Sequence, residues 1–126
     1  MKALIVDDSR TIRMMLKKFL LAEGFNDLFE AGDGSEALAK LKEVGPVDLA
    51  LVDWNMPVMD GLDFVKNLRS SKSFDCVRVV MLTTESEAAK VARAMDAGAN
   101  AFLTKPFNPD ALRGKLDTIG FEKKSA

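Results

Sequence analysis

Three aspartates stand directly after two short apolar segments. Asp7 and Asp8 follow residues 3–6, and Asp53 follows residues 49–52. If these segments are neighbouring parallel strands, the three carboxylates meet at one edge of a sheet, where their like charges repel one another. Mg²⁺ relieves such repulsion, because it favours one or two carboxylates together with a backbone carbonyl and waters. The sequence therefore predicts a Mg²⁺ site at Asp7, Asp8 and Asp53.

Two further polar residues follow apolar segments nearer the C-terminus. Thr83 follows residues 77–82, and Lys105 follows residues 101–103. Lys105 precedes a proline, which keeps its backbone out of the helical region. A cis bond to Pro106 would aim the ammonium group inward. At the acidic edge, the ammonium could reach an anion that the carboxylates cannot bind by themselves.

These residue types match the chemistry of an aspartyl phosphate. A carboxylate acts as the nucleophile, while a metal ion and a lysine neutralise the charge that develops on the transferred oxygens. We nominate Asp53 as the nucleophile, because the adjacent Asp7 and Asp8 make the better chelating pair. Asp8 has an alternative role as a helix cap in competition with Ser9. Asp60 opens a helix, so we expect it to be a cap.

Five apolar segments alternate with helical patterns, which predicts an α/β fold. Two of the segments, at 3–6 and 49–52, are continuously apolar, as strands covered on both faces must be. Right-handed crossovers then place helices on both faces of a parallel sheet. We predict a doubly wound, flavodoxin-like sheet of five parallel strands in the order 2-1-3-4-5 with five helices. The expected strands are residues 3–6, 27–30, 49–52, 77–82 and 101–103.

Local signals mark the ends of the helices. Apolar residues at helical spacing from 12 to 20 predict the first helix, which Gly24 ends. Asn108 followed by Pro109 begins the fifth helix. The fourth helix stops at Gly98, and its buried face is expected to consist of Ala88, Val91, Ala92 and Met95.

The bulk composition describes one soluble domain that covers residues 1–126. With 126 residues, 48% of them apolar, the chain can bury a core without disulfides or a structural metal. A net charge of -1 gives no reason to expect binding to nucleic acid or to a membrane. The lone Cys76 cannot form an internal disulfide, and no apolar segment approaches the length of a membrane span. We therefore expect a cytoplasmic protein.

Four motifs occur in order at the expected strand ends. They are LIVDDS at 4–9, LVDWNMPVMDG at 51–61, MLTTE at 81–85 and TKPF at 104–107. Each motif alone is weak, but the set is specific. Over the whole chain the sequence resembles the receiver domain of bacterial response regulators. The segment DWNMPVMDGL is especially similar to the single-domain chemotaxis members of that family.

The resemblance implies a role for each acidic residue. Asp53 would accept the phosphoryl group. Asp7 and Asp8 would form the acidic pair, with Asp8 as the direct ligand of Mg²⁺. The backbone carbonyl of Asn55 would be a further metal ligand.

The resemblance also implies a switch. Thr83 would be its hydroxyl group, and Lys105 would be the partner of the phosphoryl group. Phe102 matches an aromatic switch position that is tyrosine in the enteric chemotaxis protein, so any hydrogen bond of that hydroxyl is lost here. Asn55 and Glu85 match positions that tune the lifetime of the phosphoryl group.

The function that the resemblance implies is that of a stand-alone phosphoacceptor switch, which is not an enzyme acting on other substrates. Its expected partners are a sensor histidine kinase, a target protein such as the flagellar motor switch, and a phosphatase. An alternative is a phosphorelay shuttle that passes the group to another histidine protein. An FMN carrier would need a Ser/Thr-rich phosphate loop where Asp7 and Asp8 stand. A haloacid-dehalogenase-like phosphatase would need an aspartate in place of Ser9.

The expected output surface is the face formed by the fourth helix, the fifth strand and the fifth helix. Lys90 and Arg93 would point outward from the fourth helix, and Lys115 would join them from the fifth. We interpret these cations as a basic rim that receives an acidic, amphipathic helix of a target. Solvated surface charge is the alternative interpretation.

Overall fold

Five short segments rich in buried apolar residues pair into one parallel sheet. The computed structural model describes residues 1–84 and 88–121, and its strand order is β2-β1-β3-β4-β5. This order and the flavodoxin-like architecture confirm the prediction from the sequence. The strands are β1 (Lys2–Val6), β2 (Asp27–Ala31), β3 (Leu49–Asp53), β4 (Arg78–Thr83) and β5 (Ala101–Thr104).

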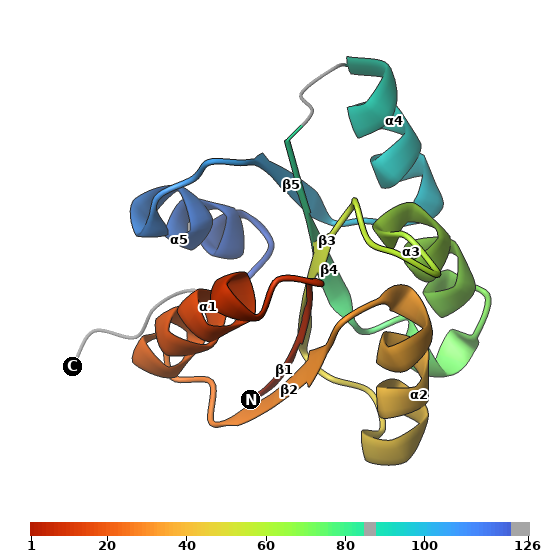
Figure 1. Cartoon of the computed structure of the whole chain (residues 1–126), viewed down its shortest axis with the longest axis horizontal. Coiled ribbons are helices and arrows are strands. Elements are labelled where there is room, and N and C mark those ends of the chain that lie inside the picture. Colours follow the sequence, from red (N-terminus) through yellow and green to blue (C-terminus); the bar gives the residue numbers. More distant parts are fainter. Residues whose placement is uncertain (85–87, 122–126) are drawn as a thin grey trace.

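Helices cover both faces of the sheet (Figure 1). The helices are α1 (Arg10–Ala22), α2 (Gly34–Val44), α3 (Gly61–Arg69), α4 (Ala88–Ala97) and α5 (Pro109–Thr118), and a short 3₁₀ helix η1 (Lys72–Phe74) precedes β4. Helices α1 and α5 pack on one face, whereas α2, α3 and α4 pack on the other. Because both faces are buried, β3 is apolar throughout until Asp53. None of the helices in the described part of the chain is long and apolar enough to span a membrane.

The register of the strands brings the polar residues to one edge. Strand β1 pairs with β3 so that Val6 lies opposite Val52, which leaves Asp7 beside Asp53. Strand β4 pairs with β5 so that Thr83 lies opposite Thr104, immediately before Lys105. Since all five strands are parallel, these residues share the carboxyl edge of the sheet, where ligands of doubly wound folds bind.

The helix caps show which aspartates have a structural role and which are free of one. The Ser9 hydroxyl accepts a hydrogen bond from the Ile12 amide at 3.3 Å and caps α1, so Asp8 is not the cap. Asp60 caps α3 by accepting a hydrogen bond from the Asp63 amide at 2.9 Å, as expected. These two caps leave the Asp8 side chain available at the carboxyl edge, while Asp60 is occupied.

The predicted buried face of α4 is wrong. Ala94 is the buried residue of this helix, and Val91 is half-buried, but Ala92 is exposed and Met95 is 42% exposed. The side chain of Ala88 lies outside the described residues. The prediction weighted the large apolar Met95, whereas a small alanine allows the closer approach of the helix to its neighbours.

Candidate functional site

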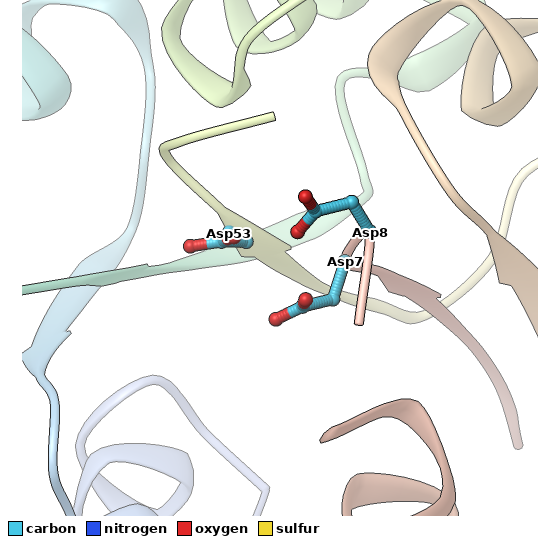
Figure 2. Close-up of side chains that lie close together, drawn as sticks. All are labelled: Asp7, Asp8 and Asp53. Atoms are coloured by element: carbon cyan, nitrogen blue, oxygen red, sulfur yellow. The ribbon is translucent and has the colours of Figure 1, made fainter. Parts of the chain in front are cut away.

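Three carboxylates converge at the carboxyl edge of the sheet. One carboxylate oxygen from each of Asp7, Asp8 and Asp53 lies within 4.8 Å of the other two. Figure 2 shows their side chains side by side at the ends of β1 and β3. Asp7 is 1% exposed and Asp53 is 5% exposed, while Asp8 is exposed. The expected convergence is therefore found, with two buried carboxylates and one that faces solvent.

A lysine bridges the two buried carboxylates. Lys105 Nζ lies 3.2 Å from Asp7 Oδ2 and 3.1 Å from Asp53 Oδ1. Its backbone amide donates to the carbonyl of Thr83 at 2.6 Å, which ties the loop after β5 to the end of β4. The Lys105–Pro106 peptide bond is cis, as the sequence analysis anticipated. The lysine thus joins the cluster from an element far away in the sequence.

The cluster holds more negative than positive charge. Three carboxylates face one ammonium group, which leaves two charges unbalanced when all are ionised. Burial raises the pKa of Asp53, the charge of Asp7 raises it further, and Lys105 only partly opposes them. Burial lowers the pKa of Lys105, but Asp53 and Asp7 outweigh it, so that the pKa is raised overall. The protein therefore keeps a repulsive arrangement that a bound cation would relieve.

The local backbone holds Asp7 and Asp53 in place. Asp7 Oδ1 accepts a hydrogen bond from the Ser9 amide at 2.8 Å, which aligns the turn into α1. Behind Asp53, the Trp54 carbonyl accepts a hydrogen bond from the Gly61 amide at 2.9 Å. A Cβ atom at Gly61 would lie only 2.9 Å from Trp54 Cα, so this close approach requires glycine.

The donor set fits Mg²⁺. Hard oxygen ligands from two or three carboxylates, open to solvent on the side of Asp8, leave room for the waters that Mg²⁺ retains. Asn55 lies two residues beyond Asp53 in the loop after β3 and is exposed. Its backbone carbonyl as a metal ligand stays a prediction.

The expected switch residues lie on the two strands beside the cluster. Thr83, at the end of β4, is 3% exposed. Phe102 on β5 is half-buried, and Lys115 Nζ lies 5.5 Å above the centre of its ring. Glu85, one of the two expected lifetime residues, lies outside the described residues. Thr83 thus lies beside Lys105 of the cluster, and Phe102 contacts Lys115 of α5, while the roles of both residues as a switch remain predictions.

The three cations of the expected basic rim lie in different environments. Lys90 Nζ lies 5.9 Å above the Trp54 ring, next to the nucleophile candidate, and its residue is only half-exposed. Arg93 borders a cleft of about 510 Å³ between α3 and α4, which Lys66 and Arg69 also line. The contact between Lys90 and Trp54 was missed in the sequence analysis, because no periodic signal pairs residues so distant in the chain.

Comparison with known proteins agrees with this geometry. Residues 3–117 match the response regulator receiver domain family. The chain is 43% identical over 119 residues to the chemotaxis protein CheY1 of Helicobacter pylori, covering 94% of this chain and 96% of the relative.

Solved structures give the same result. The chemotaxis response regulator CheY4 of Vibrio cholerae superimposes with a TM-score of 0.85 at 40% identity, covering 94% of this chain and 97% of that one. A CheX–CheY–BeF3–Mg complex from Borrelia burgdorferi has a TM-score of 0.87 at 29% identity, covering 94% of this chain and 87% of the matched one. With its strand order, its acidic cluster and these similarities, the chain belongs to the response regulator receiver domain family.

Proposed function

We propose that this chain is a stand-alone response regulator that is phosphorylated on Asp53 with the help of Mg²⁺. The observation that carries the proposal is the position of Asp53. Its buried carboxylate contacts Lys105 and lies against Asp7 and Asp8 in a cluster with excess negative charge. Asp7 and Asp53 share one ammonium group, so the charge of these two buried carboxylates is only partly balanced, and a bound cation would relieve their repulsion.

In the proposed reaction a carboxylate oxygen of Asp53 attacks the phosphorus atom of a donor. The new P–O bond forms as the bond between phosphorus and the donor breaks, and the donor imidazole or acetate leaves with the electron pair. Bound Mg²⁺ would supply positive charge for the phosphoryl oxygens. Asp8 and Asp7, with the carbonyl of Asn55, would hold that ion. Lys105, which already contacts Asp53 Oδ1, would shift toward the new phosphoryl oxygens.

The proposed output is a change at the face formed by α4, β5 and α5. Movement of the Thr83 hydroxyl toward the phosphoryl group would free space for the Phe102 ring to turn inward, which is the kind of two-state element that phosphorylation biases. Lys90, Arg93 and Lys115 would then present positive charge to an acidic target. Reversing the charge at Lys90 or Arg93 should weaken target binding and leave Asp53 phosphorylation unchanged.

The proposed biological setting is chemotaxis in the cytoplasm. It is supported by the names of the relatives, CheY1 and CheY4, which are chemotaxis proteins covered along almost their full length. A sensor histidine kinase would be the donor, and the flagellar motor switch is the proposed target. The CheX–CheY complex supports the proposal that a CheX-like protein, acting as a phosphatase, is a further partner.

We propose that Asn55 and Glu85 govern the lifetime of the phosphoryl group by controlling the approach of water. Asn55 is exposed and lies two residues after Asp53, which is consistent with this role. A bulkier side chain at either position should change the rate of decay without preventing labelling. A lifetime that is insensitive to both positions would remove this part of the proposal.

Labelling with acetyl phosphate tests the proposal directly. The wild-type protein should gain one phosphoryl group in the presence of Mg²⁺ and none when a chelator removes the ion, as measured by intact mass. Asp53→Asn should gain no label. The matched control is Asp60→Asn, because Asp60 caps α3 within the same loop and should not react. Labelling of Asp53→Asn at the wild-type rate would overturn the assignment.

A further inference from the structure

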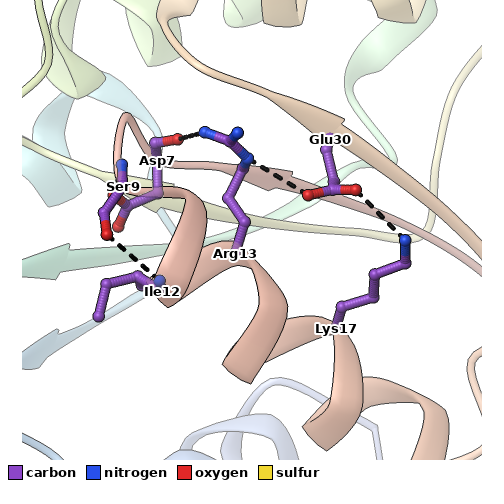
Figure 3. A network of polar contacts seen from close by, with 6 residues as sticks. All are labelled: Asp7, Ser9, Ile12, Arg13, Lys17 and Glu30. Atoms are coloured by element: carbon purple, nitrogen blue, oxygen red, sulfur yellow. Dashed lines mark hydrogen bonds and ion pairs between the residues drawn. The ribbon is translucent and has the colours of Figure 1, made fainter.

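Arg13 on α1 connects the acidic cluster to strand β2 (Figure 3). Its Nη1 donates a hydrogen bond to the backbone carbonyl of Asp7 at 2.6 Å, and its Nε lies 3.2 Å from Glu30 Oε1. Glu30 also accepts from Lys17 Nζ at 3.3 Å through its other oxygen. The side chain of Arg13 is 20% exposed, so the guanidinium lies largely inside the protein.

The carbonyl that Arg13 contacts belongs to the peptide group between the two acidic residues. A peptide group is planar, so fixing the Asp7 carbonyl also fixes the orientation of the Asp8 amide nitrogen. The Asp7 amide donates to Ala31 at 3.1 Å, and its carboxylate accepts from Ser9 at 2.8 Å. Asp7 is therefore held at its amide, its carboxylate and its carbonyl.

Asp8 has no such support of its own. Within residues 1–84 and 88–121, no hydrogen bond or ion pair to its carboxylate is found, and the residue is exposed. The direction of its side chain consequently depends on the backbone that carries it. In the described part of the chain, Arg13 is the side chain that holds this backbone, through its hydrogen bond to the Asp7 carbonyl.

The positive charge of Arg13 would by itself oppose the binding of a cation nearby. Glu30 offsets this charge, because it lies in direct contact with the guanidinium. A guanidinium, unlike an ammonium group, offers separate nitrogens in a rigid plane that can meet Glu30 and the Asp7 carbonyl together. The pair thus supplies a hydrogen bond to the site with little net charge.

We propose that Arg13, held by Glu30, is a positioning residue that orients the Asp7–Asp8 peptide group so that Asp8 points toward the cation. The inference rests on the proposed Mg²⁺ site. It adds that the affinity of this site depends on a side chain that contacts neither the ion nor the phosphoryl group.

The central test is Arg13→Lys, which keeps the positive charge but loses the simultaneous contacts with the Asp7 carbonyl and Glu30. Titration with MgCl₂ alone, followed by calorimetry, should give a dissociation constant roughly tenfold weaker than that of the wild-type protein, the low end for loss of an outer-shell partner. In phosphorylation by acetyl phosphate, the half-saturating Mg²⁺ concentration should rise by the same factor. The rate at saturating Mg²⁺ should change less than about twofold, a separation that general destabilisation would not produce.

Two variants separate position from charge. Lys17→Met removes a cation that contacts Glu30 but not Asp7, and it should leave Mg²⁺ affinity within about twofold of the wild-type value. Glu30→Gln leaves the charge of Arg13 unbalanced, so its Mg²⁺ affinity relative to that of the wild-type protein at the same salt concentration should recover in part when the salt concentration is raised from about 0.05 to about 0.5 M. The loss in Arg13→Lys should persist at both salt concentrations.

The outcomes distinguish this inference from the function on which it rests. If the wild-type protein binds no Mg²⁺, the metal site itself is wrong and the role of Arg13 falls with it. If the wild-type protein binds Mg²⁺ and Arg13→Lys binds it equally well, the metal site stands and the positioning role is overturned. If Lys17→Met weakens binding as much as Arg13→Lys does, the affinity does not depend specifically on the contact between Arg13 and the Asp7 carbonyl, and the positioning role is again overturned.

Discussion

Each of the two edges of the sheet holds a partly buried cation, but the groups that contact the cation differ between them. At the amino edge, Arg69 donates to neutral oxygens, among them the carbonyl of Gly98 at 3.0 Å and the carbonyl of Val77 at 2.6 Å. At the carboxyl edge, Lys105 contacts the charged carboxylates of Asp7 and Asp53. Burial lowers the pKa of Arg69, whereas the carboxylates raise the pKa of Lys105.

The difference shows that the cation at the amino edge has its hydrogen bonds satisfied by the protein, whereas charge remains unbalanced at the carboxyl edge. Arg69 joins the ends of α3 and α4 to the segment before β4, and each of its three nitrogens has an acceptor within the protein. Lys105 is outnumbered by three carboxylates, so its edge retains unbalanced charge. We infer that the amino edge is a structural joint, while the carboxyl edge is arranged for a ligand that carries positive charge.

Removing Arg69 should have the largest effect on stability. In Arg69→Met several partly buried carbonyls lose their donor, and we expect the free energy of unfolding to fall by about 3 kcal/mol. Urea denaturation measures this loss. Lys66→Met, one turn earlier on α3 at an exposed position, should change stability by less than about 0.5 kcal/mol. Mg²⁺ affinity should be unchanged in both variants, and a large change in Arg69→Met would contradict the separation of the two edges.

Removing Lys105 should destabilise the protein less, and Mg²⁺ should correct the defect. Lys105→Met leaves Asp7 and Asp53 without their shared cation, at a cost of about 2 kcal/mol in a chelating buffer. Because Mg²⁺ takes over the neutralisation, it should raise the melting temperature of this variant more than that of the wild-type protein. Equal increases would mean that the ion does not share the site of the ammonium.

Neutralising Asp53 should stabilise the protein in the absence of Mg²⁺. The raised pKa means that the folded state binds a proton on Asp53 more tightly than the unfolded state does. That contribution to stability is complete below the unfolded pKa and is lost as the pH rises through the folded pKa. Asp53→Asn should therefore gain about 1 kcal/mol near pH 7, which is about 4 °C in melting temperature.

The pH dependence of this gain in stability is the control for the prediction. The advantage of Asp53→Asn should shrink as the pH falls toward about 4, because the raised pKa means that a growing fraction of the wild-type carboxyl is protonated. Thermal melts of both proteins at the two pH values measure it. An advantage that stays constant with pH would show that the charge of Asp53 is not the cause.

The smallest expected effect concerns Val58, in the loop that follows Asp53. Val58 has a φ of 67° and is 87% exposed, a left-handed backbone conformation that a β-branched residue rarely adopts. Val58→Gly should stabilise the protein by about 0.5 kcal/mol, since relief of this strain exceeds the entropy lost by glycine. Ala39→Gly, at an exposed helical position of α2, should instead lose about 1 kcal/mol. Chemical denaturation of the two variants should give opposite signs.

The fold and the acidic cluster could be predicted because they follow from local patterns. The apolar segments of β1 and β3 specify buried parallel strands, and parallel strands deliver the residues that follow them to one edge. Asp7, Asp8 and Asp53 therefore converge whatever the details of packing.

Other features depend on contacts that leave no local signal. The joint at Arg69 links residues 29 positions apart, and the contact of Arg13 with Asp7 depends on the direction of one long side chain. The buried face of α4 was misjudged, because several alanines made two faces of the helix similar in hydrophobicity and only packing in three dimensions selects Ala94. Glu85, for which the resemblance implies a role in the lifetime of the phosphoryl group, lies outside the described residues.

Calorimetric titration with Mg²⁺ tests most directly the claim that the carboxyl edge is arranged for a cation. The wild-type protein should bind one ion per chain, and the binding should be lost or strongly weakened in Asp8→Asn. Asp60→Asn, which alters a capping carboxylate in the same region, should bind as the wild-type protein does. Absence of binding in the wild-type protein, or undiminished binding in Asp8→Asn, would contradict the account.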